Sequence, residues 1–382
     1  MIDARLLRLA TACALLPLAL GGCGSFWPWS EPAKPPMPEP PPVTAAVPAR
    51  LAWTARLGPA GIGFAPVFAG GSVFAASADG AVARIDPASG RNVWQVAIGK
   101  PLSSGVGSDG EVVVVSAADG TLIALDGDGK PKWTAALGGK AVTVPSVGFG
   151  LVIVRSSDNR VQAFEADSGK RRWSSKRQNP PLVLRQTSSV AITAPTTYVG
   201  LPAGRLVALG LQNGAQRWEA SVAQPTGATE IERIADVVGS PLVSGRDVCA
   251  ASYNGKLACF DTTTGRARWS RDVTGSRGFD MDARLVGIVD ERDRVHAFSR
   301  SGASIWRQDK FGGRLLSGPA SLGPVLVFGD AKGLVHLVSR DDGAVAGRFP
   351  TDGSPIVSAP VAAGRLAIVQ TSAGSLAAIE LE

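Results

Sequence analysis

The chain contains few residues that could bind a metal, and its two histidines, His296 and His336, are the first candidates. They stand three residues before Ser299 and Ser339, at the same position of two consecutive sequence repeats. A zinc site combines histidines with cysteines or carboxylates at close, regular spacing, and we find no such set around either histidine. We therefore expect no metal site and interpret both imidazoles as packing residues, with metal binding as the alternative.

Two of the four cysteines, Cys249 and Cys259, could form a disulfide because they flank Asn254-Gly255, a dipeptide typical of hairpin turns. With a two-residue loop the residue opposite Cys249 would be Phe260, and the two sulfur atoms would lie on opposite faces of the hairpin. A bulge would change that register. We favour two buried thiols, and a disulfide formed in an oxidising compartment is the alternative.

Several aspartates precede a glycine at turn spacing. Asp79-Gly80 and Asp119-Gly120 are typical of two-residue hairpin loops, in which both residues need a positive φ, and Asp126 with Gly129 spans a longer turn. A carboxylate in such a turn accepts a hydrogen bond from its own backbone. We therefore interpret these aspartates as turn formers, and we predict no catalytic residue, no cofactor and no enzyme activity.

These turns belong to a sequence repeat whose best copy is the stretch 119–133 (DGTLIALDGDGKPKW). One aromatic residue marks each copy: Trp53, Trp94, Trp133, Trp173, Trp218, Trp269, Trp306 and Phe349. Successive marks are 41, 39, 40, 45, 51, 37 and 43 residues apart. A period near 40 residues is the signature of a repeat architecture.

Each copy is predicted to form strands rather than helices. Runs such as 112–115 (VVVV), 151–154 (LVIV) and 325–328 (VLVF) are short, aliphatic and bounded by turn residues. Because these runs do not alternate apolar with polar residues, both of their faces are expected to be buried. Four such strands in about 40 residues describe one blade of a β-propeller.

Eight aromatic marks predict an all-β fold, an eight-bladed β-propeller of four-stranded antiparallel blades over residues 51–382. The last copy ends after its third strand and has no tryptophan, whereas Trp53 stands in a single strand before the first copy. The N-terminal strand is therefore predicted to complete the last blade and close the ring, which removes the exposed edges of an open sheet. The tryptophans are expected to fill the space between neighbouring blades.

The N-terminus has the features of an exported, lipid-anchored protein. Residues 1–22 combine two arginines with the apolar run 9–20, which is typical of a signal peptide and too short to span a membrane. The sequence Leu20-Gly21-Gly22-Cys23 is similar to the lipobox of bacterial lipoproteins, where the signal is cut before the cysteine that carries the lipid. Gly24 resembles the outer-membrane class of these proteins, so we expect an anchor in the outer membrane, facing the periplasm.

Residues 23–50 are predicted to be the lipidated cysteine followed by a tether. Nine prolines stand between positions 24 and 50, and such a segment cannot pack a core. As extended polyproline II it would reach roughly 80 Å. The propeller is therefore expected to work at a distance from the membrane.

The formal net charge of +7 is modest for a chain of this length. No basic patch is interleaved with aromatic residues, so we predict no nucleic-acid binding. The densest basic cluster is formed by Lys170, Arg171, Arg172, Lys176 and Arg177. We interpret it first as a solvated loop and second as a partner-binding surface.

Two insertions mark one side of the predicted ring. The two longest spacings, 45 and 51 residues, are consecutive, and the extra residues follow Trp173 and Trp218. Antiparallel four-stranded blades place all blade-to-blade connections on one face, so these two insertions are expected to be neighbours. Enlarged loops on a rigid scaffold are common binding sites, and the alternative is that Leu182 and Leu184 fold the longer loop onto its blade.

The repeat DG-x-x-x-A-x-D-x-x-x-G-x-x-x-W, matched best at 119–133, resembles the repeat of pyrroloquinoline-quinone-type propellers. Within that group, a lipobox, a short tether and a single eight-bladed domain resemble the BamB family of the β-barrel assembly machinery. The resemblance covers the whole chain. Its most specific stretches are 182–185 (LVLR), 194–197 (APTT) and 229–237 (TEIERIADV).

The resemblance implies a non-catalytic scaffold that binds the periplasmic POTRA domains of BamA and assists the folding and insertion of outer-membrane proteins. It implies Leu182, Leu184, Arg185 and Asp236 as partner-binding residues. Where a second acidic residue is expected, two positions after Asp236, this chain has Val238. The implied partners are BamA, the outer membrane through the lipid anchor, and nascent outer-membrane proteins, and the propeller itself is expected to be monomeric.

Two other functions remain as alternatives. A scaffold of another envelope complex would have the same fold, because fold does not determine function. A quinone-dependent dehydrogenase shares the repeat, but the resemblance to those enzymes implies a longer chain with two adjacent cysteines against the cofactor and a calcium site. No two cysteines are adjacent here, so we favour the scaffold.

Overall fold

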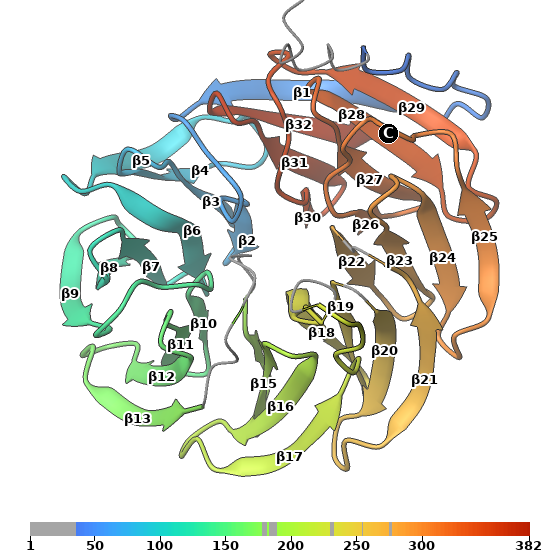
Figure 1. Cartoon of the computed structure of the whole chain (residues 1–382). Helices are drawn as coiled ribbons and strands as arrows, with labels where there is room; N and C mark the ends of the chain where they lie inside the picture. The colour runs from blue at the N-terminus through green and yellow to red at the C-terminus, as the bar shows by residue number, and fades with distance from the viewer. Residues whose placement is uncertain (1–35, 178–181, 183–188, 230–232, 254, 275–276) are drawn as a thin grey trace, which may run out of the picture. The chain divides into compact units, whose positions relative to one another are not determined.

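The computed structural model describes residues 36–177, 182, 189–229, 233–253, 255–274 and 277–382. The chain divides after Met37, and the unit Pro38–Glu382 is described below. Its strands form eight four-stranded antiparallel sheets arranged as blades around a central axis (Figure 1). Among the described residues, no helix has the length and apolar character needed to cross a membrane.

The first four blades follow one another along the chain, and each begins with its inner strand. Blade 1 contains β2 (Val67–Ala69), β3 (Ser72–Ala76), β4 (Ala81–Ile85) and β5 (Asn92–Ala97). Blade 2 contains β6 (Leu102–Ser108), β7 (Val112–Ala117), β8 (Thr121–Asp126) and β9 (Pro131–Ala136). Blade 3 contains β10 (Ser146–Gly148), β11 (Leu151–Arg155), β12 (Arg160–Glu165) and β13 (Arg171–Lys176). Blade 4 contains β14 (Ala191–Ile192), β15 (Thr196–Leu201), β16 (Arg205–Gly210) and β17 (Gln216–Ser221).

The next three blades repeat this order, and the last blade joins both ends of the ring. Blade 5 contains β18 (Val237–Ser244), β19 (Asp247–Ser252), β20 (Lys256–Asp261) and β21 (Ala267–Asp272). Blade 6 contains β22 (Gly278–Met281), β23 (Leu285–Val289), β24 (Val295–Ser299) and β25 (Ser304–Gln308). Blade 7 contains β26 (Ala320–Leu322), β27 (Val325–Gly329), β28 (Leu334–Ser339) and β29 (Val345–Pro350). Blade 8 contains β30 (Val361–Ala363), β31 (Leu366–Gln370), β32 (Ser375–Leu381) and β1 (Ala49–Arg56).

The eighth blade confirms closure by the N-terminal strand. β1 pairs antiparallel with β32, from Ala49 opposite Leu381 to Arg56 opposite Ser375. Trp53 stands opposite Ala378 and is 8% exposed. The predicted eight-bladed all-β fold is therefore confirmed, and β32 has a partner instead of an open edge.

The second and third strands of the blades are buried on both faces, as their unbroken aliphatic runs predict. All six residues of β7 are buried. Val112 and Val114 of blade 2 share one core cluster with Val152 and Val154 of blade 3. The core is therefore a set of layers between neighbouring blades rather than one central cluster.

The tryptophans join each blade to the next through a hydrogen bond and a glycine. In blade 2 the indole Nε1–H of Trp133 donates to the carbonyl oxygen of Ala166 in blade 3 at 2.8 Å. Gly169 has a φ of 69°, and a Cβ atom at this position would lie 2.6 Å from the Trp133 ring. The turn therefore needs glycine both for its backbone and for the close approach of the indole. The other six tryptophans of the described residues donate in the same way, to Pro87, Gly127, Leu211, Thr262, Arg300 and Arg340.

Phe349 replaces tryptophan in blade 7 because blade 8 has no equivalent turn. The outer strand of blade 8 comes from the other end of the chain, so no hairpin carbonyl stands there to accept an indole N–H. Phe349 instead packs in one cluster with Val47 and Ala49 from the N-terminal segment. Blade 8 lacks the hairpin that accepts an indole N–H in the other blades, which explains why blade 7 has phenylalanine in place of tryptophan.

Residues 38–48, which we name the N-terminal strap, lie against blade 7. The backbone N–H groups of Thr44 and Ala45 donate to the carbonyl oxygen of Val345 at 2.9 and 3.2 Å. The side chains of Arg314 and Arg348 donate to the carbonyl oxygens of Pro38 and Pro41, respectively. The last part of the proline-rich stretch is thus bound to the propeller, because its carbonyl groups, which prolines leave free, accept hydrogen bonds from arginines.

The cysteines of blade 5 correct one prediction. Cys249 and Cys259 stand opposite each other in the β19–β20 ladder and form a disulfide, so the preferred interpretation of two free thiols is wrong. Three residues rather than two connect Ser252 to Lys256. The odd loop length shifts the register by one residue from the predicted one, which brings both sulfur atoms to the same face.

Candidate partner-binding face

One end of the ring carries every connection from the outer strand of one blade to the inner strand of the next, and we name it the connection face. The two longest connections, residues 177–190 and 222–236, enter blades 4 and 5. They begin and end on neighbouring blades, as the consecutive long spacings predict (Figure 1). The scaffold therefore brings the two insertions to one side of the connection face.

Leu182 lies within the first of these connections and is 43% exposed. An exposed leucine on a rigid scaffold is available for contact with another protein, because its burial there would remove apolar surface from water. The other two predicted contact residues of this connection, Leu184 and Arg185, lie outside the described residues.

Asp236 is only 6% exposed and stands at the base of the second connection. Its carboxylate accepts a hydrogen bond from the backbone N–H of Ala203 at 2.9 Å, in the turn between β15 and β16. Burial lowers the pKa of the nearby Arg155 to about 10, and the negative charge of Asp236 acts in the opposite direction. Asp236 therefore holds the end of the second connection against blade 4. Its negative charge also acts on Arg155 of blade 3.

Val238 occupies the position where the resemblance implies a second acidic residue. Its side chain is 1% exposed and packs in the core between blades 5 and 6 with Phe279. A carboxylate would be costly among these apolar groups. In this chain the position therefore belongs to the blade core.

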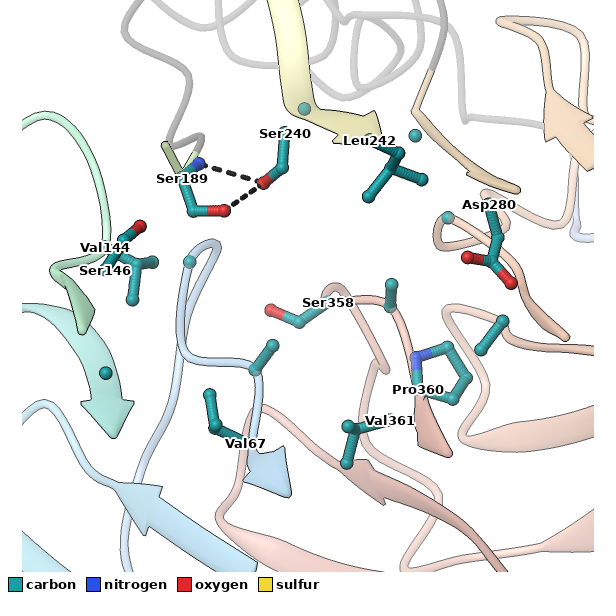
Figure 2. Close-up of a pocket in the computed structure, with 18 of the residues that line it drawn as sticks. Val67, Val144, Ser146, Ser189, Ser240, Leu242, Asp280, Ser358, Pro360 and Val361 are labelled. Atoms are coloured by element: carbon teal, nitrogen blue, oxygen red, sulfur yellow. Dashed lines mark hydrogen bonds between the residues drawn. The ribbon is translucent and has the colours of Figure 1, made fainter. Parts of the chain in front are cut away.

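The inner strands surround a central cavity of about 630 Å³. Figure 2 shows its wall, with apolar side chains such as Val67, Leu242 and Val361 beside a few polar groups. The backbone N–H of Ser321 donates to the Asp280 carboxylate at 2.5 Å. The paired hydroxyls of Ser189 and Ser240 form another polar contact of the wall. These groups are bound to one another, and we find no arrangement of a nucleophile with a base among the described lining residues.

The described residues contain no group of three or more His, Cys, Asp or Glu side chains that could hold a metal ion. The disulfide of blade 5 lies in β19 and β20, whereas the cavity is lined by inner strands and the segments before them. The described structure therefore places no cysteine in the wall of the cavity.

Both histidines bind carboxylates that the sequence analysis overlooked. His336 is fully buried, and its Nε2 lies 2.8 Å from the carboxylate of Asp330, which also binds Arg314. In blade 6, the Nε2 atom of His296 lies 2.9 Å from the carboxylate of Asp290. The signal was present in the sequence, because each aspartate precedes its histidine by six residues and opens the turn that leads to the histidine's strand.

The buried group of Asp330, His336 and Arg314 keeps the same protonation states near neutral pH. Burial lowers the pKa of His336, so the imidazole is neutral. Burial would raise the pKa of Asp330, but hydrogen bonds from His336, the backbone and Arg314 lower it to about 2. The ionised Asp330 thus balances Arg314, whose remaining donor group binds the strap at Pro38.

Comparison with known proteins agrees with the geometry. The sequence profile of the family described as "Outer membrane protein assembly factor BamB" matches residues 43–95, 78–301 and 291–382. The outer membrane protein assembly factor BamB of Bordetella pertussis is 40% identical over 362 residues, which cover 94% of this chain and 93% of the relative.

Solved structures share the same ring. The crystal structure of BamB from Moraxella catarrhalis superposes with a TM-score of 0.79 at 26% identity, covering 87% of this chain and 99% of that one. The quinohemoprotein alcohol dehydrogenase of Comamonas testosteroni superposes with a TM-score of 0.67 at 16% identity, covering 87% of this chain and 76% of that one. The second likeness shows the fold alone. The family profile and the relatives that match over nearly their whole length show that this chain belongs to the BamB family of outer membrane protein assembly factors.

Proposed function

We propose that this protein is a non-catalytic scaffold that binds the POTRA domains of BamA and assists the assembly of outer-membrane β-barrel proteins. The observation that carries the proposal is the exposed Leu182 on the first of two neighbouring insertions, in a chain whose family is that of assembly factors. In this proposal Leu182, Leu184 and Arg185 contact the partner. Asp236 acts by holding the base of the second insertion in position.

Binding should depend on a few residues of the first insertion. Replacing Leu182 and Leu184 with Ser, or Arg185 with Glu, is expected to weaken binding to the POTRA domains by about 2 kcal/mol or more, because a few apolar anchors and one charge dominate most interfaces. The fold should remain intact, since residues of a connection are expected to contribute little to the blade core. The measurement is the dissociation constant with purified POTRA domains, together with the thermal midpoint of each variant.

Two exposed apolar residues of other connections provide matched controls for this experiment. Ile62 and Val357 are 66% and 39% exposed and lie in the connections that enter blades 1 and 8. Replacing either with Ser should leave the dissociation constant unchanged. If the Leu182 and Leu184 variants instead melted early while their folded fraction bound normally, these leucines would be core residues and the proposed contact would be wrong.

We further propose that Cys23 carries the lipid that anchors the protein in the outer membrane, on the periplasmic side. Only the thiol of Cys23 could accept the lipid at that position, so Cys23→Ser should leave the protein soluble or uncleaved. Membrane fractionation and the mass of the mature N-terminus check this prediction. Recovery of the variant in the outer membrane with lipid attached would refute it.

The likeness to the alcohol dehydrogenase makes a quinone-dependent dehydrogenase the second candidate. It is less well supported, because the chain has no adjacent cysteines and its cavity wall carries a single described carboxylate, Asp280. Added quinone and calcium should produce neither binding nor dye reduction. A pull-down from detergent-solubilised envelope would distinguish the BamA scaffold from a scaffold of another envelope complex.

A further inference from the structure

The positive charge of this chain is concentrated in two neighbouring blades. Residues 137–221, which form blades 3 and 4 and the connections that enter them, contain eleven Lys and Arg and four Asp and Glu. This excess of seven equals the formal net charge of the whole chain, +7. The rest of the chain is therefore neutral as a whole, and the protein has one electrically distinct side.

Four cationic side chains of blades 3 and 4 are exposed on the outer surface of the ring. Lys170, Arg171 and Lys176 stand on or directly before β13, and Arg217 stands on β17. Figure 1 shows these two strands as the outermost strands of neighbouring blades. Within the described structure their side chains make no ion pair or hydrogen bond. We name these four residues the basic rim.

The Asp and Glu side chains of blades 3 and 4 are already paired with cations outside the basic rim. Glu219 binds Arg177 and Arg205, and Glu165 lies 3.8 Å from Arg172. On other outer strands, by contrast, a cation usually has its own carboxylate, as Lys132 of β9 with Asp167, Arg268 of β21 with Asp261, and Arg307 of β25 with Asp309. The basic rim thus keeps an uncompensated positive field.

Protection of the strand edge does not account for this cluster. Lysines on an exposed edge strand discourage pairing with other chains, and every blade except the last presents such an edge from its own outer hairpin. β5, the outer strand of blade 1, carries no charged residue, and β9 of blade 2 carries one. An outer strand of this fold therefore needs at most one charge for edge protection.

The basic rim is continuous with the connection that carries Leu182. β13 ends at Lys176, and the chain passes directly into residues 177–190. At this junction Arg177 donates to Gln216 of β17 at 2.7 Å, which joins the start of the connection to the neighbouring blade. A partner that covers the connection would therefore also approach the basic rim.

We propose that the basic rim is a second docking surface for the POTRA domains of BamA and that it meets an acidic surface of that partner; this inference rests on the function proposed above. Charges at the margin of an interface act mainly by steering the encounter and raise the association rate by about 10-fold or more at low salt. The connection that carries Leu182 determines how long the complex lasts, and the basic rim determines how fast it forms.

The position of the N-terminal strap favours a protein partner over the membrane surface. The described chain reaches the propeller at Pro38, which is bound by Arg314 in the segment that enters blade 7. In a ring of eight blades, blade 7 is diametrically opposite blade 3. The strap thus lies on the side of the ring away from the basic rim.

The test compares association rates of the intact lipoprotein in detergent with purified POTRA domains at about 50 and about 300 mM NaCl. The rim variant combines Lys170→Gln, Arg171→Gln and Lys176→Gln. Its control combines Lys130→Gln, Lys310→Gln and Lys332→Gln, which remove the same charge from exposed, unpaired lysines of the described structure. Lys130 precedes β9 as Lys170 precedes β13, so the backbone context is matched.

The rim variant should associate about 10-fold more slowly at low salt, with a weaker salt dependence and a dissociation rate within about 3-fold of the wild type. The control should behave as the wild type. Equal association rates for the two variants would overturn the basic rim and leave the proposed function standing. A wild-type protein that does not bind the POTRA domains would overturn both. If only the rim variant lost binding to phosphatidylglycerol vesicles, while its association with the POTRA domains was unchanged, the basic rim would be a lipid-binding surface. This result would overturn the proposal.

Discussion

Deleting Ala49 to Arg56 is expected to abolish the folded ring. The deletion removes β1, which pairs with β32 along its whole length and inserts Trp53 between blades 8 and 1. The Trp53 indole donates to the carbonyl oxygen of Pro87 at 2.7 Å and covers Gly90. Removing this strand opens both the edge of blade 8 and the apolar layer beside blade 1.

The size of the loss follows from its parts. Truncating a core tryptophan alone costs about 3 to 5 kcal/mol, and the deletion adds the loss of the whole β1–β32 ladder. A domain is typically stable by about 5 to 15 kcal/mol, so the variant should be unfolded or aggregated at 25 °C. Circular dichroism and size-exclusion chromatography of the exported protein measure this outcome.

A deletion of residues 24–35 provides the control, because it shortens the predicted tether and leaves the strap and β1 unchanged. This shorter protein should melt within about 1 °C of the wild type, since it loses no contact described for the propeller. Equal thermal midpoints for the two truncations would contradict closure of the ring by the N-terminal strand.

Trp133→Ala should cost about 3 to 5 kcal/mol of the free energy of unfolding, as large-to-small substitutions of aromatic residues in cores do. The indole is partly buried in the layer between blades 2 and 3, covers Gly169 and donates a hydrogen bond to Ala166. Because Gly169 has no side chain, the surrounding groups cannot fill the space left by the indole. Urea denaturation measures the loss.

Trp133→Phe separates the hydrogen bond from the packing. It keeps an aromatic ring, as Phe349 does naturally in blade 7, and loses only the N–H donor and part of the ring. It should cost about 1 to 3 kcal/mol, because the buried carbonyl oxygen of Ala166 loses its donor. If the Phe and Ala variants were equally unstable, packing against the glycine would contribute nothing and the interpretation of the repeat would need revision.

These substitutions divide the repeat residues from the insertion residues. Trp133 should affect stability and leave the binding constant of the folded protein unchanged, because its side chain lies between two blades rather than in the 177–190 connection. Leu182 should affect binding and leave stability unchanged, because it is exposed. The two sets of variants together test whether the scaffold and the contact are separable.

Much of the architecture could be predicted from the sequence because it repeats. Eight aromatic marks at a period near 40 residues, with Trp53 before the first copy and no tryptophan in the last, predict both the number of blades and the closing strand. Every blade buries the same positions, so each copy supplies independent support for the same assignment. The consecutive long spacings likewise predict two insertions on neighbouring blades, since the chain order of blades is also their order around the ring.

Contacts that lie outside the repeat could not be predicted in this way. The disulfide between Cys249 and Cys259 depends on one additional loop residue, and a shift of one residue exchanges the faces of a strand. The binding of Asp330 to His336 depends on how a turn folds back over the following strand. Each of these features is decided by local backbone geometry, about which periodicity carries no information.

The sequence by itself determined the ring, its closure and the concentration of positive charge in residues 137–221. Only the tertiary structure decided which of those charges are paired, that Asp236 and Val238 are buried, and that the strap lies on blade 7. The physical reason is that each copy of the repeat buries its residues according to the order of residues close together in the sequence. Exposure, ion pairing and the docking of an aperiodic segment depend on groups that come together only when the ring has closed.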